Sequence, residues 1–390
     1  MAPSIYGLDH LKEALALQLF GGAPKRFPDI RVRGELNVLL IGDPGTAKSQ
    51  LLQHAARLAP RGLYTSGRGT TAAGLTAAVI RERQEGGMTL EAGALVLADR
   101  GLCAIDEIEK MRPEDRVAVH EVMEQHTVSV AKGGIVATLN ARTAVLAAAN
   151  PALGRYVRER TVAENISLPV TILSRFDLIF VLTDVPDKEA DAKLSGHVLA
   201  LHKDLAPPTQ PPIPQELLRK YIAYARRIDP RLTDEAVQRL QQFYLEMRSA
   251  SSDSGSPVAI TVRQLESLVR LAEAHARMAL RREVTAEDAE AAVLLMRKSM
   301  EQVGVDLKTG KFDADILLTG KPSSLRDKMS TVLGIVVELE REAGMTEEKA
   351  IIELAKTRYG ILEEEARRLI AEMVRQGTLF EPRPGYWKKT

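Results

Sequence analysis

The sequence predicts an α/β fold with a parallel sheet, followed by a helical unit and a small C-terminal unit. Residues 1–205 alternate short apolar runs with helical patterns, which is typical of a parallel sheet covered by helices on both faces. A Pro-rich stretch follows, and residues 215–302 then read as helices. With 390 residues, the chain is long enough for two or three domains.

Four continuous apolar runs are the expected strands of the sheet. They are Asn37–Ile41, Leu102–Ile105, Thr143–Ala149 and Leu178–Leu182. Strands of a parallel sheet are buried on both faces, so they read as unbroken apolar runs. These runs place the sheet in residues 1–205.

Two linkers and a winged helix are expected in the rest of the chain. Ala206–Pro214 is rich in proline and predicts a stiff linker. Thr233, Thr261 and Thr285 each stand just before a helical pattern within 206–302, as helix-capping residues do. Residues 303–324 contain several glycines and predict a second linker. Residues 325–390 show three helical patterns and then a terminal hairpin with its turn at Glu381–Gly385, which is the outline of a winged helix.

Composition limits the classes of protein that fit. The net charge of +1 gives no overall basic field, so any contact with nucleic acid must be local. The single cysteine, Cys103, cannot form a disulfide framework and fits a reducing compartment. No run approaches transmembrane length and no signal peptide is visible, so we expect a cytoplasmic protein without a membrane partner.

The most specific motif follows the first apolar run and precedes a helical pattern at Ser49–Ala59. It consists of Gly42, Asp43, Pro44, Gly45, Thr46, Ala47, Lys48 and Ser49. A Gly-rich loop between a strand and a helix is the setting of a phosphate-binding loop, whose N–H groups hold a nucleoside triphosphate. Lys48 would reach the β- and γ-phosphates, and the Ser49 hydroxyl would ligate Mg²⁺. Ala47 stands where the common pattern has Gly, and it fits there if its φ is negative. The alternative is a chance Gly-rich turn.

Acidic and amide side chains end two further strands. Asp106 and Glu107 follow Leu102–Ile105, so Asp106 would hold Mg²⁺ and Glu107 would polarise the attacking water. Asn150 ends the run Thr143–Ala149 and would position that water or touch the γ-phosphate. Ligands of open parallel sheets bind at this carboxyl edge. The alternatives are solvated acids at a strand end and an Asn that begins a turn.

Arg175 precedes its strand, Leu178–Leu182, and therefore lies near the edge opposite Lys48. A six-residue strand spans roughly 20 Å, so Arg175 is too far from its own subunit's γ-phosphate. It would reach a neighbour's γ-phosphate as an arginine finger supplied in trans. The alternative is a surface arginine paired with Asp177.

With these motifs in place, the chain resembles the minichromosome maintenance (MCM) family of AAA+ replicative helicases, most closely its archaeal members. The segments that carry the resemblance are Gly42–Ser49, Ala104–Met111, Ala147–Pro151 and Leu173–Phe180. The family's phosphate loop also has Ala before the Lys. The resemblance implies an AAA+ P-loop core, a helical lid, a C-terminal winged helix, and the use of ATP with Mg²⁺. It places Ile5 and Tyr6 beside the adenine, and it makes Arg263 a second arginine that acts in trans. The alternative for Arg263 is an exposed residue in a helix's first turn.

Two segments resemble the DNA-engaging hairpins of the family. Val128–Ala131 and Ile135–Leu139 flank a Lys-Gly-Gly turn and read independently as a β-hairpin. The family's central-channel hairpin carries a lysine at its tip, which here is Lys132, and a ring of such lysines would contact single-stranded DNA. The alternative is a solvated turn lysine. Residues 81–97 resemble the loop that interrupts the family's second helix.

Family members usually carry a large N-terminal lobe, whereas the ATPase motifs of this chain begin at Pro3. We therefore expect an excised fragment or a shortened relative that lacks this lobe. The leading hypothesis is an ATP-driven DNA helicase or translocase that assembles as a homo-oligomeric, hexameric ring in the archaeal cytosol or nucleoid. One alternative is a regulator or partner subunit that binds ATP without unwinding DNA alone. Another is an AAA+ protein remodeller. The third helix of the C-terminal unit opens with Glu363-Glu364-Glu365, so we expect this unit to contact protein rather than DNA.

Overall fold

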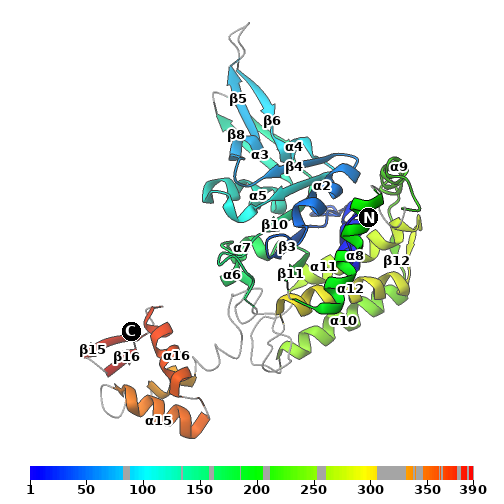
Figure 1. Ribbon diagram of the computed structural model, residues 1–390. Helices are drawn as coiled ribbons and strands as arrows, with labels where there is room; N and C mark the ends of the chain where they lie inside the picture. The colour runs from blue at the N-terminus through cyan, green and yellow to red at the C-terminus, as the bar shows by residue number, and fades with distance from the viewer. Residues whose placement is uncertain are drawn as a thin grey trace. The chain divides into compact units, whose positions relative to one another are not determined.

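The computed structural model describes residues 1–81, 88–132, 135–157, 162–184, 186–204, 211–252, 261–304, 331–336, 339, 346–359, 361, 363–375, 379–383 and 386–389. Its elements form two compact units (Figure 1). The first unit contains the elements from α1 to α12, and the second contains those from β14 to β16.

The first unit is built on a five-stranded parallel sheet, which confirms the predicted α/β fold. The strands lie in the order β11 (Leu178–Leu182), β3 (Val38–Gly42), β10 (Ala144–Ala149), β7 (Leu102–Asp106) and β4 (Gly62–Ser66). Four of them are the predicted apolar runs. The edge strand β4 was not predicted, because its residues are polar or only half-buried. All five strands run in one direction, so their carboxyl ends share one edge.

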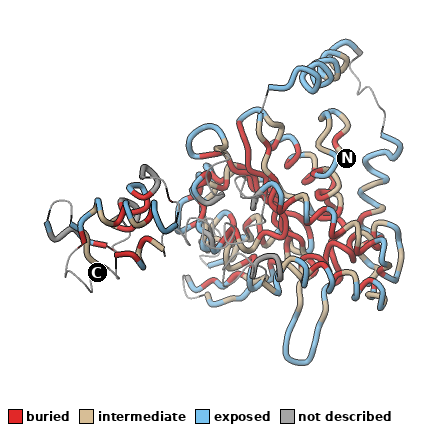
Figure 2. Tube along the Cα trace, turned by 90° about the horizontal axis from the view of Figure 1, so that it is seen from below, coloured by how far each residue is buried: buried red, intermediate tan, exposed pale blue. Residues whose placement is uncertain are grey.

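Successive residues of each central strand enter two different cores. Val38 and Leu40 of β3 pack in one core, and Leu39 and Ile41 pack in the other. This alternation follows from the two-residue period of a strand. In Figure 2 the buried residues of the larger unit gather in its interior, and exposed residues lie around them. The continuous apolar runs therefore reflect burial on both faces, as predicted.

Helices cover both faces of the sheet. α1 (Asp9–Phe20), α2 (Lys48–Leu58) and the later helices α10–α12 contribute to one core, and α3 (Ala72–Leu75), α4 (Ala94–Leu97), α5 (Pro113–Gln125) and α7 (Val170–Leu173) contribute to the other. The remaining elements of this part are β1 (Lys25–Arg26), β2 (Arg31–Val32), η1 (Ile108–Lys110), α6 (Val162–Asn165) and α8 (Lys188–Asp204). Among the described residues, no helix has both the length and the apolar character needed to cross a membrane.

Two β-hairpins are inserted between the elements of the sheet and extend away from it (Figure 1). The predicted hairpin over Val128–Leu139 is confirmed, with β8 (Thr127–Lys132) paired to β9 (Ile135–Asn140). The second hairpin pairs β5 (Ala77–Arg81) with β6 (Met88–Ala92). It begins four residues before the insert that we expected at residues 81–97, since Ala77–Ile80 already pair across it. Its tip at 82–87 lies outside the described residues.

A helical subdomain completes the first unit. It contains α9 (Gln215–Ala225), β12 (Arg231–Leu232), α10 (Asp234–Ser252), α11 (Val262–Met278), β13 (Glu283–Val284) and α12 (Ala286–Gly304). The predicted helix starts are confirmed: Thr261 and Gln264 form a capping box, and the Thr285 N–H donates to Asp288. Of the first expected linker, residues 206–210 lie outside the described residues.

Among its described residues, the second unit packs two helices and a further helical segment against a small sheet. Residues 331–336 are helical, and α15 (Glu348–Tyr359) and α16 (Glu363–Arg375) follow. The sheet has the order β14 (Thr346–Glu347), β16 (Tyr386–Lys389) and β15 (Leu379–Arg383). The terminal hairpin is confirmed, but β15 continues to Arg383, so the turn does not begin at Glu381 as expected. Residues 305–324 of the second expected linker lie outside the described part of the chain.

Candidate functional site

The phosphate loop lies where β3 ends and α2 begins. β3 ends at Gly42, and α2 starts at Lys48 with Ala47 as its N-cap. A Cβ at Gly42 would lie 2.2 Å from the Leu182 carbonyl oxygen of the neighbouring strand β11, so the site requires glycine. Our expectation for Ala47 was wrong, because its φ is +63° rather than negative. The loop therefore places a side chain in a left-handed conformation that favours glycine.

Lys48 lies within this loop. Its ammonium donates hydrogen bonds to the carbonyl oxygens of Gly42 at 2.8 Å and Asp43 at 2.7 Å. Burial lowers its pKa, while the nearby carboxylates of Asp106, Asp43 and Glu109 oppose that shift. Lys48 is 6% exposed. Lys48 of the phosphate loop and Asp106 at the end of β7 therefore lie close enough for their charges to interact.

Asp43 holds the loop in shape. Its N–H donates to the Leu182 carbonyl, so that donor is already used within the protein. Its buried carboxylate accepts from the N–H groups of Tyr156 at 2.7 Å and Asp184 at 2.9 Å, which follow β10 and β11. We had grouped Asp43 with the phosphate-binding residues; its N–H and its carboxylate contact residues outside the loop, whereas its carbonyl accepts from Thr46 and Lys48 within the loop.

The two acids at the end of β7 have different surroundings. Asp106 is 7% exposed and accepts hydrogen bonds from the Tyr64 hydroxyl at 2.8 Å and the Glu107 N–H at 2.9 Å. Glu107 has φ +50° and caps η1, and its carboxylate accepts from the Lys110 ammonium at 2.5 Å. Ser49 is exposed in the first turn of α2. The hydroxyl of Ser49 and the carboxylate of Asp106 are oxygen donors of the kind that Mg²⁺ prefers.

Glu109 is a residue of this site that the sequence reasoning missed. The Asn150 amide donates to its Oε1 at 3.2 Å, and burial raises its pKa. Its Oε2 is buried and has no hydrogen-bond partner among the described residues. Its spacing from Asp106 could have identified it. Glu109 lies three residues after Asp106, and in a 3₁₀ turn two residues three apart lie on the same side of the helix. Tyr64 was missed for a different reason, since it comes from the unpredicted strand β4.

A cavity of about 430 Å³ lies along α2, the helix that follows the phosphate loop. It lies between the N-terminal segment, α2 and α8, and its lining is Ala2, Ser4, Ile5, Gln50, Gln53, His54, Arg57, Val198 and Leu201. Its volume falls in the range of roughly 300–1,000 Å³ that is usual for small-molecule sites. Ile5, which the resemblance predicted to contact the nucleotide, lines this cavity. Tyr6 does not line this cavity; its ring packs against His197 with centroids 5.5 Å apart.

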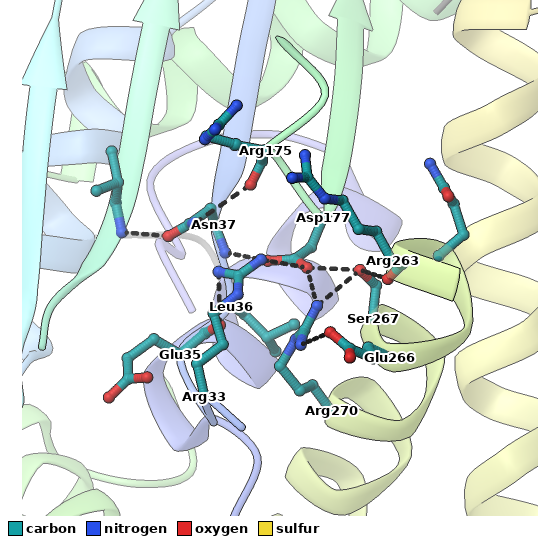
Figure 3. Close-up of polar contacts among 12 residues, drawn as sticks. Arg33, Glu35, Leu36, Asn37, Arg175, Asp177, Arg263, Glu266, Ser267 and Arg270 are labelled. Carbon is teal, nitrogen blue, oxygen red and sulfur yellow. Dashed lines mark hydrogen bonds and ion pairs between the residues drawn. The ribbon is translucent and has the colours of Figure 1, made fainter. Parts of the chain in front are cut away.

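The two predicted trans-acting arginines lie together at the opposite edge of the sheet. The Arg175 carbonyl accepts from the Asn37 side chain, and Asn37 directly precedes β3 (Figure 3). The Arg175 guanidinium pairs with Glu124 at 2.7 Å. Arg263, in the first turn of α11, approaches Ser174 with its Nη1 3.5 Å from the hydroxyl. Arg175 therefore lies one strand length from the phosphate loop of its own chain.

The alternative pairing of Arg175 with Asp177 is wrong. Asp177 is buried and instead pairs with Arg33 at 3.0 Å and Arg270 at 2.7 Å, and it accepts from the Ser267 hydroxyl (Figure 3). Ser267 and Arg270 belong to α11. This cluster fixes the start of β11 to the helical subdomain, directly beside the two arginines.

Lys132, the predicted DNA contact, ends β8 opposite Ile135. Its side chain and the glycines that follow lie outside the described residues, so the structure adds only its place at the end of the hairpin. Val136, one residue into β9 from that pair, is 86% exposed.

Comparison with known proteins matches all three parts of the chain. The family models described as the MCM P-loop domain, the MCM AAA-lid domain and the MCM protein C-terminal winged helix-turn-helix domain match residues 1–202, 216–300 and 323–390. The minichromosome maintenance protein MCM of Saccharolobus solfataricus is 54% identical over 391 residues, covering 100% of this chain and 56% of that protein. The DNA replication licensing factor MCM4 of Arabidopsis thaliana is 47% identical over 348 residues, covering 88% of this chain and 41% of that protein. The chain thus spans about half the length of these relatives.

Proposed function

The chain belongs to the MCM family, and from this premise we propose that it hydrolyses ATP at sites shared between neighbouring subunits and so moves DNA through a ring. One observation carries the proposal. Lys48 and Arg175 lie at opposite edges of one sheet, separated by the five-residue strand β3. Such a strand spans roughly 17 Å, so one chain cannot bring both to the same phosphate. The site becomes complete when a second copy supplies Arg175 and Arg263.

The phosphate-loop edge supplies the parts of the site that act within one chain. Lys48 binds the β- and γ-phosphates after exchanging its contacts with the loop carbonyls for phosphate oxygens. Ser49 and Asp106 hold Mg²⁺, which neutralises phosphate charge when it is bound. Glu107 accepts a proton from the attacking water, and Asn150 orients that water. The cavity lined by Ile5 and α2 receives the base.

The β8–β9 hairpin supplies the DNA contact of the proposal. A lysine at the end of each hairpin would form a ring of positive charge, which contacts phosphates without reading sequence. The net charge of +1 is consistent with a local contact of this kind. We assign residues 1–205 to the ATPase core, 206–302 to the lid, 303–324 to a linker and 325–390 to a winged helix that contacts protein.

ATPase activity measured over a series of protein concentrations tests the shared site. Activity per molecule is expected to rise with concentration, because Arg175 and Arg263 act on a neighbour. Glu107→Gln is expected to keep ATP binding and abolish hydrolysis. Activity that does not change with concentration would contradict shared sites and favour a subunit that binds ATP alone.

Single-stranded DNA tests the second half of the proposal. It is expected to stimulate hydrolysis, and Lys132→Ala is expected to remove that stimulation while preserving hydrolysis without DNA. Stimulation that survives in Lys132→Ala would show that the β8–β9 hairpin is not the DNA contact. Unwinding of a forked duplex by the purified chain would then separate a helicase from a translocase.

A further inference from the structure

Helix α5 holds the arginine that the proposed function places in a neighbour's site. The Arg175 guanidinium makes two contacts on its own chain: Nη2 pairs with Glu124 Oε2 at 2.7 Å, and Nη1 donates to the Thr171 carbonyl at 2.6 Å. The arginine side chain is only 11% exposed, and Glu124 is 47% exposed. Two of its five N–H donors are used by these anchors, so donors remain for a phosphate oxygen.

The ion pair is suited to orienting the arginine. A free arginine side chain samples many rotamers, and a phosphate contact would otherwise have to offset the entropy lost when one of them is selected. The hydrogen bond from Arg175 is the main cause that lowers the pKa of Glu124, so this carboxylate is charged at neutral pH. The Glu124 carboxylate and the Thr171 carbonyl accept from two different nitrogens of the guanidinium, and together they fix its orientation.

The same turn of α5 also holds the base of the β8–β9 hairpin. Glu121 lies three residues before Glu124, and its Oε1 accepts a hydrogen bond from the Ser129 N–H of β8 at 3.1 Å. The chain passes from α5 into β8 through His126 alone. One helix turn therefore contacts both the hairpin and the arginine.

We propose that Glu124 is the positioning residue for Arg175, and that the last turn of α5 connects this arginine to the β8–β9 hairpin. The inference rests on the proposed function, because it concerns the regulation of the shared site. When the hairpin moves with bound DNA, Glu121 moves the last turn of α5, and Glu124 then shifts Arg175 relative to the neighbour's phosphate. Neither acid touches the nucleotide.

Mixing two inactive variants tests the positioning role. The donor chain carries Lys48→Ala and supplies Arg175, while the acceptor chain carries Arg175→Ala and binds ATP. Hydrolysis is expected to return when the two are mixed. Adding Glu124→Ala to the donor is expected to lower the rescued kcat about tenfold with KM for ATP unchanged, because misplacing a group at a transition state costs rate. Glu124→Gln on the donor is expected to lower it less, since the amide oxygen still accepts a hydrogen bond.

The position of the substitution distinguishes positioning from misfolding. On the acceptor, Glu124→Ala has no arginine to position, so the rescued rate is expected to match that of the unmodified acceptor. Glu114→Ala on the donor removes an exposed acid from the first turn of the same helix and is the matched control. An equal loss from donor and acceptor, or no loss from the donor, would overturn the positioning role. If the unmodified pair gave no rescue, the shared site itself would be refuted, and this inference with it.

A donor with Glu121→Ala tests the link to the hairpin. The factor by which single-stranded DNA stimulates the rescued rate is expected to fall toward one, because the hairpin no longer holds the last turn of α5. Glu121→Gln is expected to preserve most of the stimulation, since its amide oxygen still accepts from Ser129. An unchanged stimulation factor with Glu121→Ala would overturn the link.

Discussion

Replacing Asp177 with Asn is expected to destabilise the first unit by about 3–5 kcal/mol, because it leaves buried arginine charge without its partner. The Asp177 side chain is 1% exposed and that of Arg270 is 3% exposed. The two carboxylate oxygens of Asp177 accept hydrogen bonds from four residues. The donors are Arg33 at 3.0 and 3.1 Å, Arg270 at 2.7 Å, the Ser267 hydroxyl at 2.5 Å and the Asn37 N–H at 2.7 Å. Since both oxygens face donors, either orientation of an Asn amide would turn its NH₂ group toward a donor.

Urea unfolding followed by two signals measures this loss in the correct unit. Far-UV circular dichroism reports the helices of the whole chain, whereas the single tryptophan, Trp387, lies in β16 of the second unit. We expect Asp177→Asn to shift the circular dichroism transition and to leave the Trp387 fluorescence transition in place. Asp29→Asn, at an exposed turn, is the control and is expected to change stability by less than about 0.5 kcal/mol.

The pH dependence gives the same prediction a second test. Burial raises the pKa of Asp177, but the attraction of Arg270 and Arg33 outweighs it and the net shift is downward. A carboxyl group with a depressed folded pKa stabilises the fold above its unfolded pKa of about 3.9, and this stabilisation is lost as the pH falls through the folded pKa. The difference in free energy of unfolding between the wild type and Asp177→Asn should therefore become smaller below about pH 4.

A double variant tests the reason for the loss. Arg270→Met removes one buried charge, so in the Asp177→Asn background it is expected to recover part of the lost stability. The reasoning would be refuted if Asp177→Asn cost less than about 1 kcal/mol at pH 7. It would also be refuted if the double variant were less stable than Asp177→Asn alone.

Three further predictions concern the phosphate-loop edge. Ala47→Gly is expected to stabilise the first unit by about 0.5–1 kcal/mol in urea unfolding, because relief of the left-handed strain exceeds the added entropy of the unfolded chain; a lower urea midpoint would contradict it. Gly42→Ala is expected to destabilise it by about 1–3 kcal/mol in the same assay, since the new Cβ meets the Leu182 carbonyl, and an unchanged midpoint would contradict the clash. The folded pKa of Glu109 is raised, so its protonated form stabilises the fold below its unfolded pKa and this contribution is lost as pH rises. The melting temperature of Glu109→Gln relative to that of the wild type should therefore rise as the pH is raised from 4 to 8. A difference in melting temperature that stays constant over this range would contradict the prediction.

The sequence predicted what depends on local pattern. Strands such as β3 and β7 are continuous apolar runs because both faces are buried, and Thr261 with Gln264 shows a capping box in four residues. The strand β4 was missed because an edge strand with the sequence Gly62–Ser66 is only partly buried. Local pattern therefore fails where an element has few buried neighbours.

Contacts between distant residues explain the other differences. The edge on which Arg175 lies followed from its place before β11, but its partner Glu124 comes from a helix 51 residues earlier. The alternative prediction that Asp177 pairs with Arg175 was wrong for the same reason, since its partner Arg270 is 93 residues away along the chain. The close approach at Gly42 and the hydrogen bond of the Asp43 N–H both involve Leu182 of β11, so these contacts also join distant residues that the loop's own sequence does not identify.

The carboxylate of Asp43 links the phosphate loop to two backbone amides that lie outside the loop. The N–H groups of Tyr156 and Asp184 donate to this one side chain, although they lie 113 and 141 residues from it along the chain. When the loop opens, both amides lose their acceptor and exchange hydrogen with solvent. Hydrogen–deuterium exchange at Tyr156 and Asp184 is therefore expected to report the free energy of opening the loop, without a label in the site itself.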